Sequence, residues 1–120
     1  MIDIQLGEVT HQFMEMIWAN EPIRSTQLVH MAEEALHWKK PTTYTVIRRL
    51  CEKGIIKNED STVSALISRE DFFAEQSDRF VSEHFGGSLP MFLAAFSRCN
   101  ELSEEDLAYM RAILREKEGK

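Results

Sequence analysis

Hydroxyl-bearing and cationic residues recur between positions 39 and 49 of this 120-residue chain, at a spacing that matches a helix. Val46, Ile47 and Leu50 form the apolar face of a helix predicted over residues 41–53. The opposite face carries side chains that can bind base edges or phosphates, namely Thr42, Thr45, Arg48 and Arg49, with Tyr44 at its margin. Such a face suits the major groove of DNA, where threonine contacts base edges and arginine contacts guanine or phosphate. An ordinary amphipathic surface helix has the same pattern, and the pattern alone does not separate the two.

The residues at both ends support this helix. Pro41 suits its first turn, and Gly54 suits the position just past its end. Lys39 and Lys40 precede the N-terminus, where free N–H groups and the helix dipole favour a phosphate. Helical phase turns Thr43 toward the core, which makes it a weaker contact with DNA. The same phase places Arg49 near the flank of the helix, where it would contact the DNA backbone or pair with Glu52. The candidate DNA-binding residues are therefore Lys39, Lys40, Thr42, Thr43, Tyr44, Thr45, Arg48 and Arg49.

The charge is unevenly distributed. The whole chain has a net charge of −6, which argues against a general polyanion binder. Residues 37–57 hold six lysines and arginines against one acid, a local charge of +5, whereas residues 67–120 hold eleven acids against seven. A basic patch on an acidic protein can bind DNA phosphates, and it predicts modest, salt-sensitive affinity for random DNA.

The elements around this helix are expected to form a winged helix-turn-helix. A first helix is predicted over residues 8–19 and a second from Ser25, which we take as its N-cap. After the third helix, two β-rich runs at 55–56 and 63–67 flank the turn residues 58–61, which predicts a short β-hairpin. Three helices and a hairpin wing would form one DNA-binding domain over residues 1–67.

The second half, residues 68–120, is predicted to contain three helices. Ser68, Ser88 and Ser103 are placed to cap them, and Gly86-Gly87 ends the first. Helices this few and this apolar need a further surface to pack against, so we expect a homodimerisation domain, with a purely intramolecular core as the alternative. The expected dimer interface consists of Phe73, Phe80, Phe85, Leu89, Phe92, Leu93, Phe96, Leu107, Met110 and Leu114.

Bulk properties set further bounds on this mainly α-helical chain. Its composition, 43% hydrophobic and 28% charged, is that of a globular domain. The sequence shows neither an apolar run long enough to span a membrane nor a signal segment, so we expect no membrane partner. We therefore expect a cytoplasmic location. Cys51 and Cys99 lack metal-binding spacing, no two histidines pair, and no nucleophile or phosphate-loop motif occurs. We expect reduced cysteines, no metal or other cofactor, and no enzymatic activity.

Five blocks of residues in a fixed order resemble the penicillinase-repressor family of winged-helix regulators, from Leu6 to about Leu114. The blocks are Met16-Ile17-Trp18; Thr42-Thr43 with Val46-Ile47-x-Arg49-Leu50-x-x-Lys53-Gly54; Leu66-Ile67-Ser68-Arg69-Glu70-Asp71-Phe72; Phe85-Gly86-Gly87-Ser88-Leu89; and Leu102-Ser103-Glu104-Glu105. The resemblance implies an N-terminal winged helix that binds DNA and a C-terminal three-helix dimerisation domain. It also implies a transcriptional repressor that binds a palindromic operator as a homodimer.

The chain departs from the family pattern in three ways. Its wing is shorter, carries Glu59 and Asp60, and lacks the family's aromatic and basic strand. Ala95-Phe96 stands where β-lactam-responsive members have the Asn-Phe pair at which they are cleaved, and the copper-responsive Cys-x-Cys motifs are absent from the C-terminus. The inducing signal and any upstream sensor or protease are therefore left open. The short acidic wing also keeps a second interpretation open, a winged-helix protein-interaction module with weak or no DNA binding.

Overall fold

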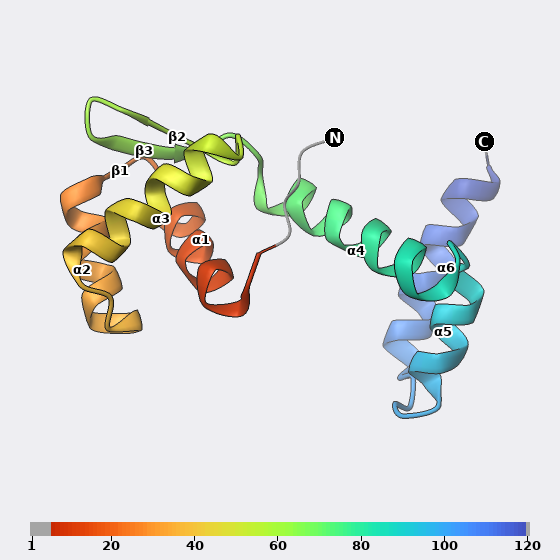
Figure 1. Ribbon diagram of the computed structural model, residues 1–120. Helices are drawn as coiled ribbons and strands as arrows, with labels where there is room; N and C mark the ends of the chain where they lie inside the picture. The colour runs from red at the N-terminus through yellow and green to blue at the C-terminus, as the bar shows by residue number, and fades with distance from the viewer. Residues whose placement is uncertain (1–5, 120) are drawn as a thin grey trace. The chain divides into compact units, whose positions relative to one another are not determined.

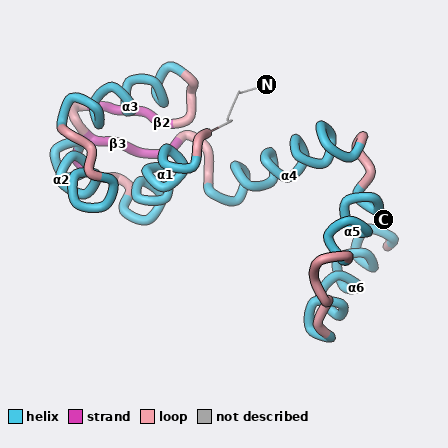
Figure 2. Tube along the Cα trace, turned by 60° about the horizontal axis from the view of Figure 1, so that its bottom comes forward, coloured by secondary structure: helices cyan, strands magenta, loops and turns pink. Residues whose placement is uncertain are grey.

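The computed structural model describes residues 6–119, and this part of the chain contains six helices and one three-stranded antiparallel sheet (Figures 1 and 2). The predicted mainly α-helical class is confirmed. The chain divides into two compact units: the first ends at Asp78 and the second begins at Arg79. No helix within residues 6–119 combines the length and the apolar character that crossing a membrane requires.

The first unit is a winged helix-turn-helix. Its elements are α1 (Glu8–Asn20), β1 (Ile23–Arg24), α2 (Ser25–Leu36), α3 (Lys40–Glu52), β2 (Ile56–Glu59), β3 (Thr62–Ala65) and the first turns of α4 (Arg69–Phe85). The strand order is β1-β3-β2, with Ile23 opposite Val63, so the predicted hairpin forms two of the three strands. The sequence did not predict β1, because two residues carry no periodic signal of their own.

The tip of the hairpin is attached to the start of α2. Asp60 and Ser61 both have positive φ, as a two-residue hairpin turn requires. The Ser61 carbonyl accepts a hydrogen bond from the Ser25 N–H (2.8 Å), and Arg24 Nη1 donates to the Asp60 carbonyl (3.4 Å). The expected role of Ser25 as an N-cap is wrong: Arg24 is the cap residue, and the buried Ser25 hydroxyl lies 3.5 Å from that of Tyr44.

The core of the first unit includes the beginning of α4. It is built from apolar side chains of α1, α2, α3 and the sheet, and its buried members include Phe13, Met14, Ile17, Leu28, Ile47, Leu50, Ile55, Ile56, Val63 and Phe72. Phe72, from the first turn of α4, is only 2% exposed, and its ring centroid lies 5.2 Å from that of Trp18. Trp18 Nε1 also donates to the Ile67 carbonyl (3.0 Å). The domain boundary expected between residues 67 and 68 stays a prediction. The division between the two compact units, after Asp78, falls within α4.

The second unit contains the end of α4, α5 (Leu89–Ser97) and α6 (Glu104–Glu118). The predicted caps are confirmed, since Ser88 Oγ accepts from the Met91 N–H (3.2 Å) and Ser103 Oγ accepts from the Asp106 N–H (3.0 Å). Gly86 and Gly87, both with positive φ, follow the end of α4. Neither α5 nor α6 has a buried residue, so this unit leaves most of its apolar surface uncovered.

Candidate nucleic-acid interface

The backbone of α3 is fixed at its C-terminus by a two-bond motif. Gly54 adopts φ +77°, its N–H donates to the Cys51 carbonyl (3.0 Å), and the Ile55 N–H donates to the Leu50 carbonyl (3.0 Å). This is the arrangement that glycine typically forms just past a helix. At the other end Pro41 lies in the first turn, and the cap residue Lys39 makes no side-chain hydrogen bond to the helix. The expected helix is therefore confirmed, one residue earlier at each end than the predicted bounds.

One face of α3 is buried and the other carries the cations. Thr43, Ile47 and Leu50 are buried against the core. The other seven predicted contact residues differ in their access to solvent: Lys39, Lys40, Thr42, Arg48 and Arg49 are exposed, whereas Tyr44 and Thr45 are half-buried. The structure thus presents most of the predicted residues on one helix surface, where they are free to meet a polyanion.

Thr43 is the exception, and its prediction as a DNA contact is corrected. Its side chain is 0% exposed, and among the described residues its hydroxyl has no hydrogen-bond partner. The helical phase that gives Ile47 and Leu50 to the core also directs Thr43 inward. A residue in this position packs α3 against the core, and its side chain is not accessible to a duplex in this conformation.

The hydroxyls beside Thr43 are already engaged within the unit. Thr45 Oγ1 donates to the Pro41 carbonyl (2.9 Å), so the hydroxyl keeps acceptor capacity and the methyl group for a ligand. The Tyr44 hydroxyl is paired with Ser25 and its ring packs against the core, so Tyr44 helps to hold α3 on α2.

The two arginines occupy different positions. Arg48 Nε lies 3.8 Å from Glu52 Oε1, and both side chains are about 70% exposed. The sequence left two roles open for Arg49, a contact with the DNA backbone or a pair with Glu52; the structure pairs Glu52 with Arg48, at the i, i+4 spacing that a helix favours. An ion pair this exposed holds its partners weakly, so Arg48 can exchange Glu52 for a phosphate. Arg49 lies on the flank facing the start of α1, where it lines a cavity of about 150 Å³ with Gly7, Thr10 and Lys53 among others.

The wing offers little positive charge. Its strand β2 carries Lys57, whose Nζ lies 3.7 Å from Glu59 Oε1, and the exposed Asp60 follows at the tip. The lysine is therefore partly neutralised by its own strand. Among the described residues of the first unit, most of the exposed cations lie on α3 and just beside its ends, while Arg24 lies beside the tip of the wing.

Other chemistry receives no support in the described part of the chain. No three histidine, cysteine, aspartate or glutamate side chains within residues 6–119 are grouped to hold a metal ion. Both cysteines are free thiols, and burial raises the pKa of the Cys51 thiol. A residue pair that the sequence did not reveal is Glu15 and Arg69, which form a close ion pair although 54 positions separate them in the chain.

Comparison with known proteins gives one consistent result. The model of the family described as "Penicillinase repressor" matches residues 6–116. A penicillinase repressor of Bacillus licheniformis is 22% identical over 116 residues, covering 93% of this chain and 91% of that protein. A penicillinase repressor of Staphylococcus aureus is 23% identical over 115 residues, covering 92% of this chain and 91% of that protein.

Proposed function

The chain belongs to the penicillinase repressor family, and we propose that it is a transcriptional repressor that binds a palindromic DNA operator as a homodimer. The observation that carries the proposal is the surface of α3, on which Lys40, Thr42 and Arg48 are exposed while Ile47 and Leu50 anchor the helix to the core. The proteins that match along almost the whole chain are both named repressors, which supports the same conclusion.

DNA binding follows from the geometry of this surface. The lysines at the start of α3 and Arg48, slightly more than two turns later, can neutralise phosphates on either side of a groove, which releases counterions. Thr42 and the methyl group of Thr45 lie between them, in reach of base edges if the N-terminal part of α3 enters the major groove. Because the wing is short and acidic, α3 and the residues just before it supply most of the contact.

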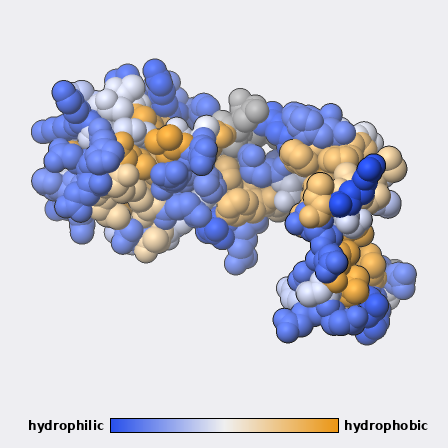
Figure 3. All heavy atoms as spheres, turned by 90° about the horizontal axis from the view of Figure 1, so that it is seen from below, coloured by the Kyte–Doolittle hydropathy of each residue, from blue (hydrophilic) through white to orange (hydrophobic). Residues whose placement is uncertain are grey.

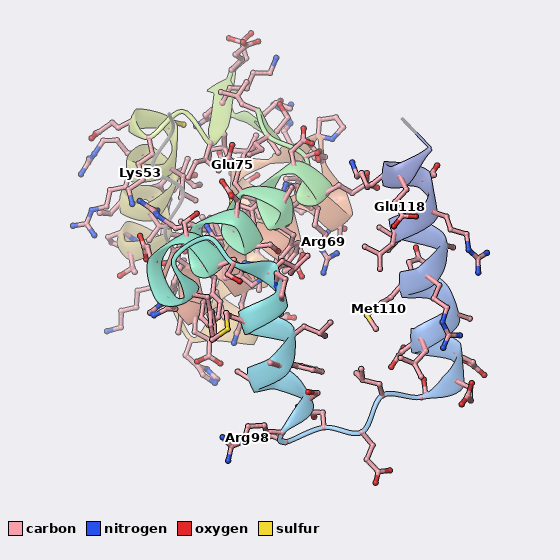
Figure 4. The ribbon with its side chains drawn as sticks, turned by 90° about the vertical axis from the view of Figure 1, so that its right-hand side faces the viewer. Lys53, Arg69, Glu75, Arg98, Met110 and Glu118 are labelled. Atoms are coloured by element: carbon pink, nitrogen blue, oxygen red, sulfur yellow. The ribbon has the colours of Figure 1, made fainter. Side chains whose placement is uncertain are left out.

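Homodimerisation is supported by the second unit. Figure 3 shows apolar side chains at the surface of the part of the molecule that holds α5 and α6. Five large apolar residues of these two helices are each more than 40% exposed, namely Leu89, Met91, Phe96, Ile113 and Leu114. Met110 projects from α6 into the space between α6 and α5 (Figure 4), where a groove of about 330 Å³ is lined mainly by apolar residues. Apolar surface left open on this scale is typical of an obligate interface, which resembles a divided core. A two-fold dimer would place its two α3 helices on half-sites about one helical turn, or a multiple of it, apart.

DNA binding is tested by selection from a random duplex library, followed by fluorescence anisotropy with the selected duplex at two salt concentrations. We expect enrichment of a palindromic sequence and affinity for it that exceeds the affinity for random DNA by about 10³-fold or more. Failure to enrich any sequence, even at low salt, would contradict the repressor and favour a protein-interaction module.

Dimerisation is tested separately by sedimentation equilibrium. Replacing the exposed Phe96 in α5 by glutamine should raise the dissociation constant of the dimer by about tenfold or more, since a central aromatic residue commonly contributes at least 1–2 kcal/mol to an interface. Ser97→Gln, the neighbouring exposed polar position, is the matched control and should leave the constant nearly unchanged. Equal effects of the two substitutions would argue against this face as the interface.

A further inference from the structure

We propose that Glu15 and Arg69 are positioning residues that set the spacing of half-sites which the repressor accepts. The inference rests on the proposed function. Glu15 lies in α1, within the winged unit, and Arg69 is the first residue of α4, the helix that continues unbroken to Phe85 in the second unit (Figure 4 labels Arg69). The pair therefore fastens the helix that leaves the winged unit to the body of that unit.

The ion pair has a geometry that fixes an angle as well as a distance. Arg69 Nε donates to Glu15 Oε1 (2.7 Å), and Arg69 Nη2 donates to Glu15 Oε2 (3.0 Å). Two parallel bonds between a planar guanidinium and a planar carboxylate hold the two groups in one plane. A lysine at position 69 would keep the charge and lose this constraint.

Aromatic rings next to the ion pair also join α4 to α1. The Arg69 guanidinium carbon lies 4.6 Å from the centroid of the Phe73 ring, one turn further along α4. The His11 ring, one turn before Glu15 in α1, stacks on Phe72 (5.6 Å) and meets the edge of Phe73 (5.4 Å). The start of α4 therefore contacts α1 in two ways, through the rings of Phe72 and Phe73 and through the Arg69 ion pair.

The ring contacts and the ion pair restrict α4 differently. Phe72 and Phe73 hold the start of α4 on the unit through apolar contacts, which have no preferred direction and would leave the helix free to tilt. The Glu15–Arg69 pair removes this freedom. Because both side chains are partly exposed, at 37% and 56%, the pair contributes little to stability, and its main effect is on the direction in which α4 leaves the unit.

Direction matters when two winged units bind one duplex. Once one winged unit of the dimer has bound its half-site, the other winged unit binds at an effective concentration that depends on the connection between them. A stiff connection of matching length gives the highest effective concentration. A looser connection lowers affinity for the preferred spacing and tolerates other spacings better. Affinity for one half-site alone is unaffected by either change.

The test compares Glu15→Gln with wild type on three sets of duplexes: the selected palindrome, the palindrome with its half-sites moved one or two base pairs closer or apart, and a duplex with one half-site scrambled. Glu8→Gln removes the same charge from the exposed first turn of the same helix and serves as the matched control. Arg69→Lys is the second variant, because it keeps the positive charge and removes the planar guanidinium that makes the two parallel bonds. Hydrogen exchange of the first two turns of α4 shows whether these turns remain folded.

We expect Glu15→Gln and Arg69→Lys to bind the palindrome about 3- to 10-fold more weakly, to lose less affinity than wild type when the spacing changes, and to bind the scrambled duplex as wild type does. An unchanged spacing profile would overturn the proposal, as would an equal loss on the palindrome and on the scrambled duplex. If wild type itself selects no palindrome, the proposed function fails. A selected palindrome with an unchanged profile in both variants overturns the positioning role alone.

Discussion

Ile55 and Leu50 are joined by a backbone hydrogen bond of 3.0 Å across the end of α3, and the side chains of both residues are buried in the core. The turn between them requires Gly54 at φ +77°. The connection from the cationic helix to the sheet therefore depends on the conformation of Gly54.

Gly54→Ala should lower the free energy of unfolding by about 1–2 kcal/mol, because an L-residue with a side chain is strained in the left-handed region. A Cβ at this position would meet no atom within 4 Å, so the cost is conformational and not steric crowding by neighbours. Urea denaturation measures it. Gly54→Asn is the control at the same site, since asparagine tolerates this conformation, and it should cost clearly less. Equal losses in the two variants would contradict this explanation.

Lys40→Ala and Arg48→Ala should each weaken operator binding and reduce the slope of log affinity against log salt by about one, the value for one lost phosphate contact. Both residues are exposed on α3. Lys117→Ala, an exposed cation in the last turn of α6, is the charge-matched control and should leave the slope unchanged. Anisotropy titrations at four salt concentrations give the slopes. If neither α3 variant changes its slope, this surface does not contact phosphates.

Thr43→Val should raise the free energy of unfolding by about 1 kcal/mol, since it removes a buried hydroxyl without a partner among the described residues and keeps the shape of the side chain. Operator affinity should stay within about twofold of wild type. The exposed Thr42→Val provides the contrast, because it should change DNA affinity and leave stability nearly unchanged. A loss of DNA affinity in a stable Thr43→Val protein would restore Thr43 as a direct contact.

The stability contribution of Glu15 should depend on pH. The hydrogen bonds from Arg69 lower the pKa of the Glu15 carboxyl in the folded protein. A carboxyl with a depressed folded-state pKa stabilises the protein above its unfolded pKa, about 4.3, and loses that contribution as pH falls through the folded value. Wild type should therefore be more stable than Glu15→Gln at pH 7, by no more than about 1 kcal/mol for a pair this exposed, and the difference should vanish toward pH 3. Urea denaturation at pH 7, 5 and 3 checks this, and a constant difference would contradict it.

Local signals in the sequence were sufficient for the helices and their ends. Serines such as Ser88 and Ser103 cap because the bond they form spans only three residues, and Gly54 ends α3 for a reason that lies within one turn. The cationic face of α3 follows from the same 3.6-residue period. These features could be predicted because each depends on residues close together in the chain.

Most of the features that were missed depend on residues far apart in the chain. Strand β1 exists only through its pairing with β3, some 40 positions later, and the buried environment of Ser25 removes it from the capping role that its type favours. Glu15 and Arg69 have no sequence signal as a pair, because either could have faced solvent alone. Arg48 rather than Arg49 meets Glu52, a choice that the i, i+4 rule could have made.

The burial of Phe72 determines when the winged unit can finish folding. Residues 6–67 lack one of the largest side chains of the core, so a chain leaving the ribosome cannot complete that core until the first turn of α4 has emerged. The first turn of α4 can then pack on α1 before α5 and α6 have left the ribosome. The order of emergence thus places a finished winged unit ahead of the exposed apolar helices.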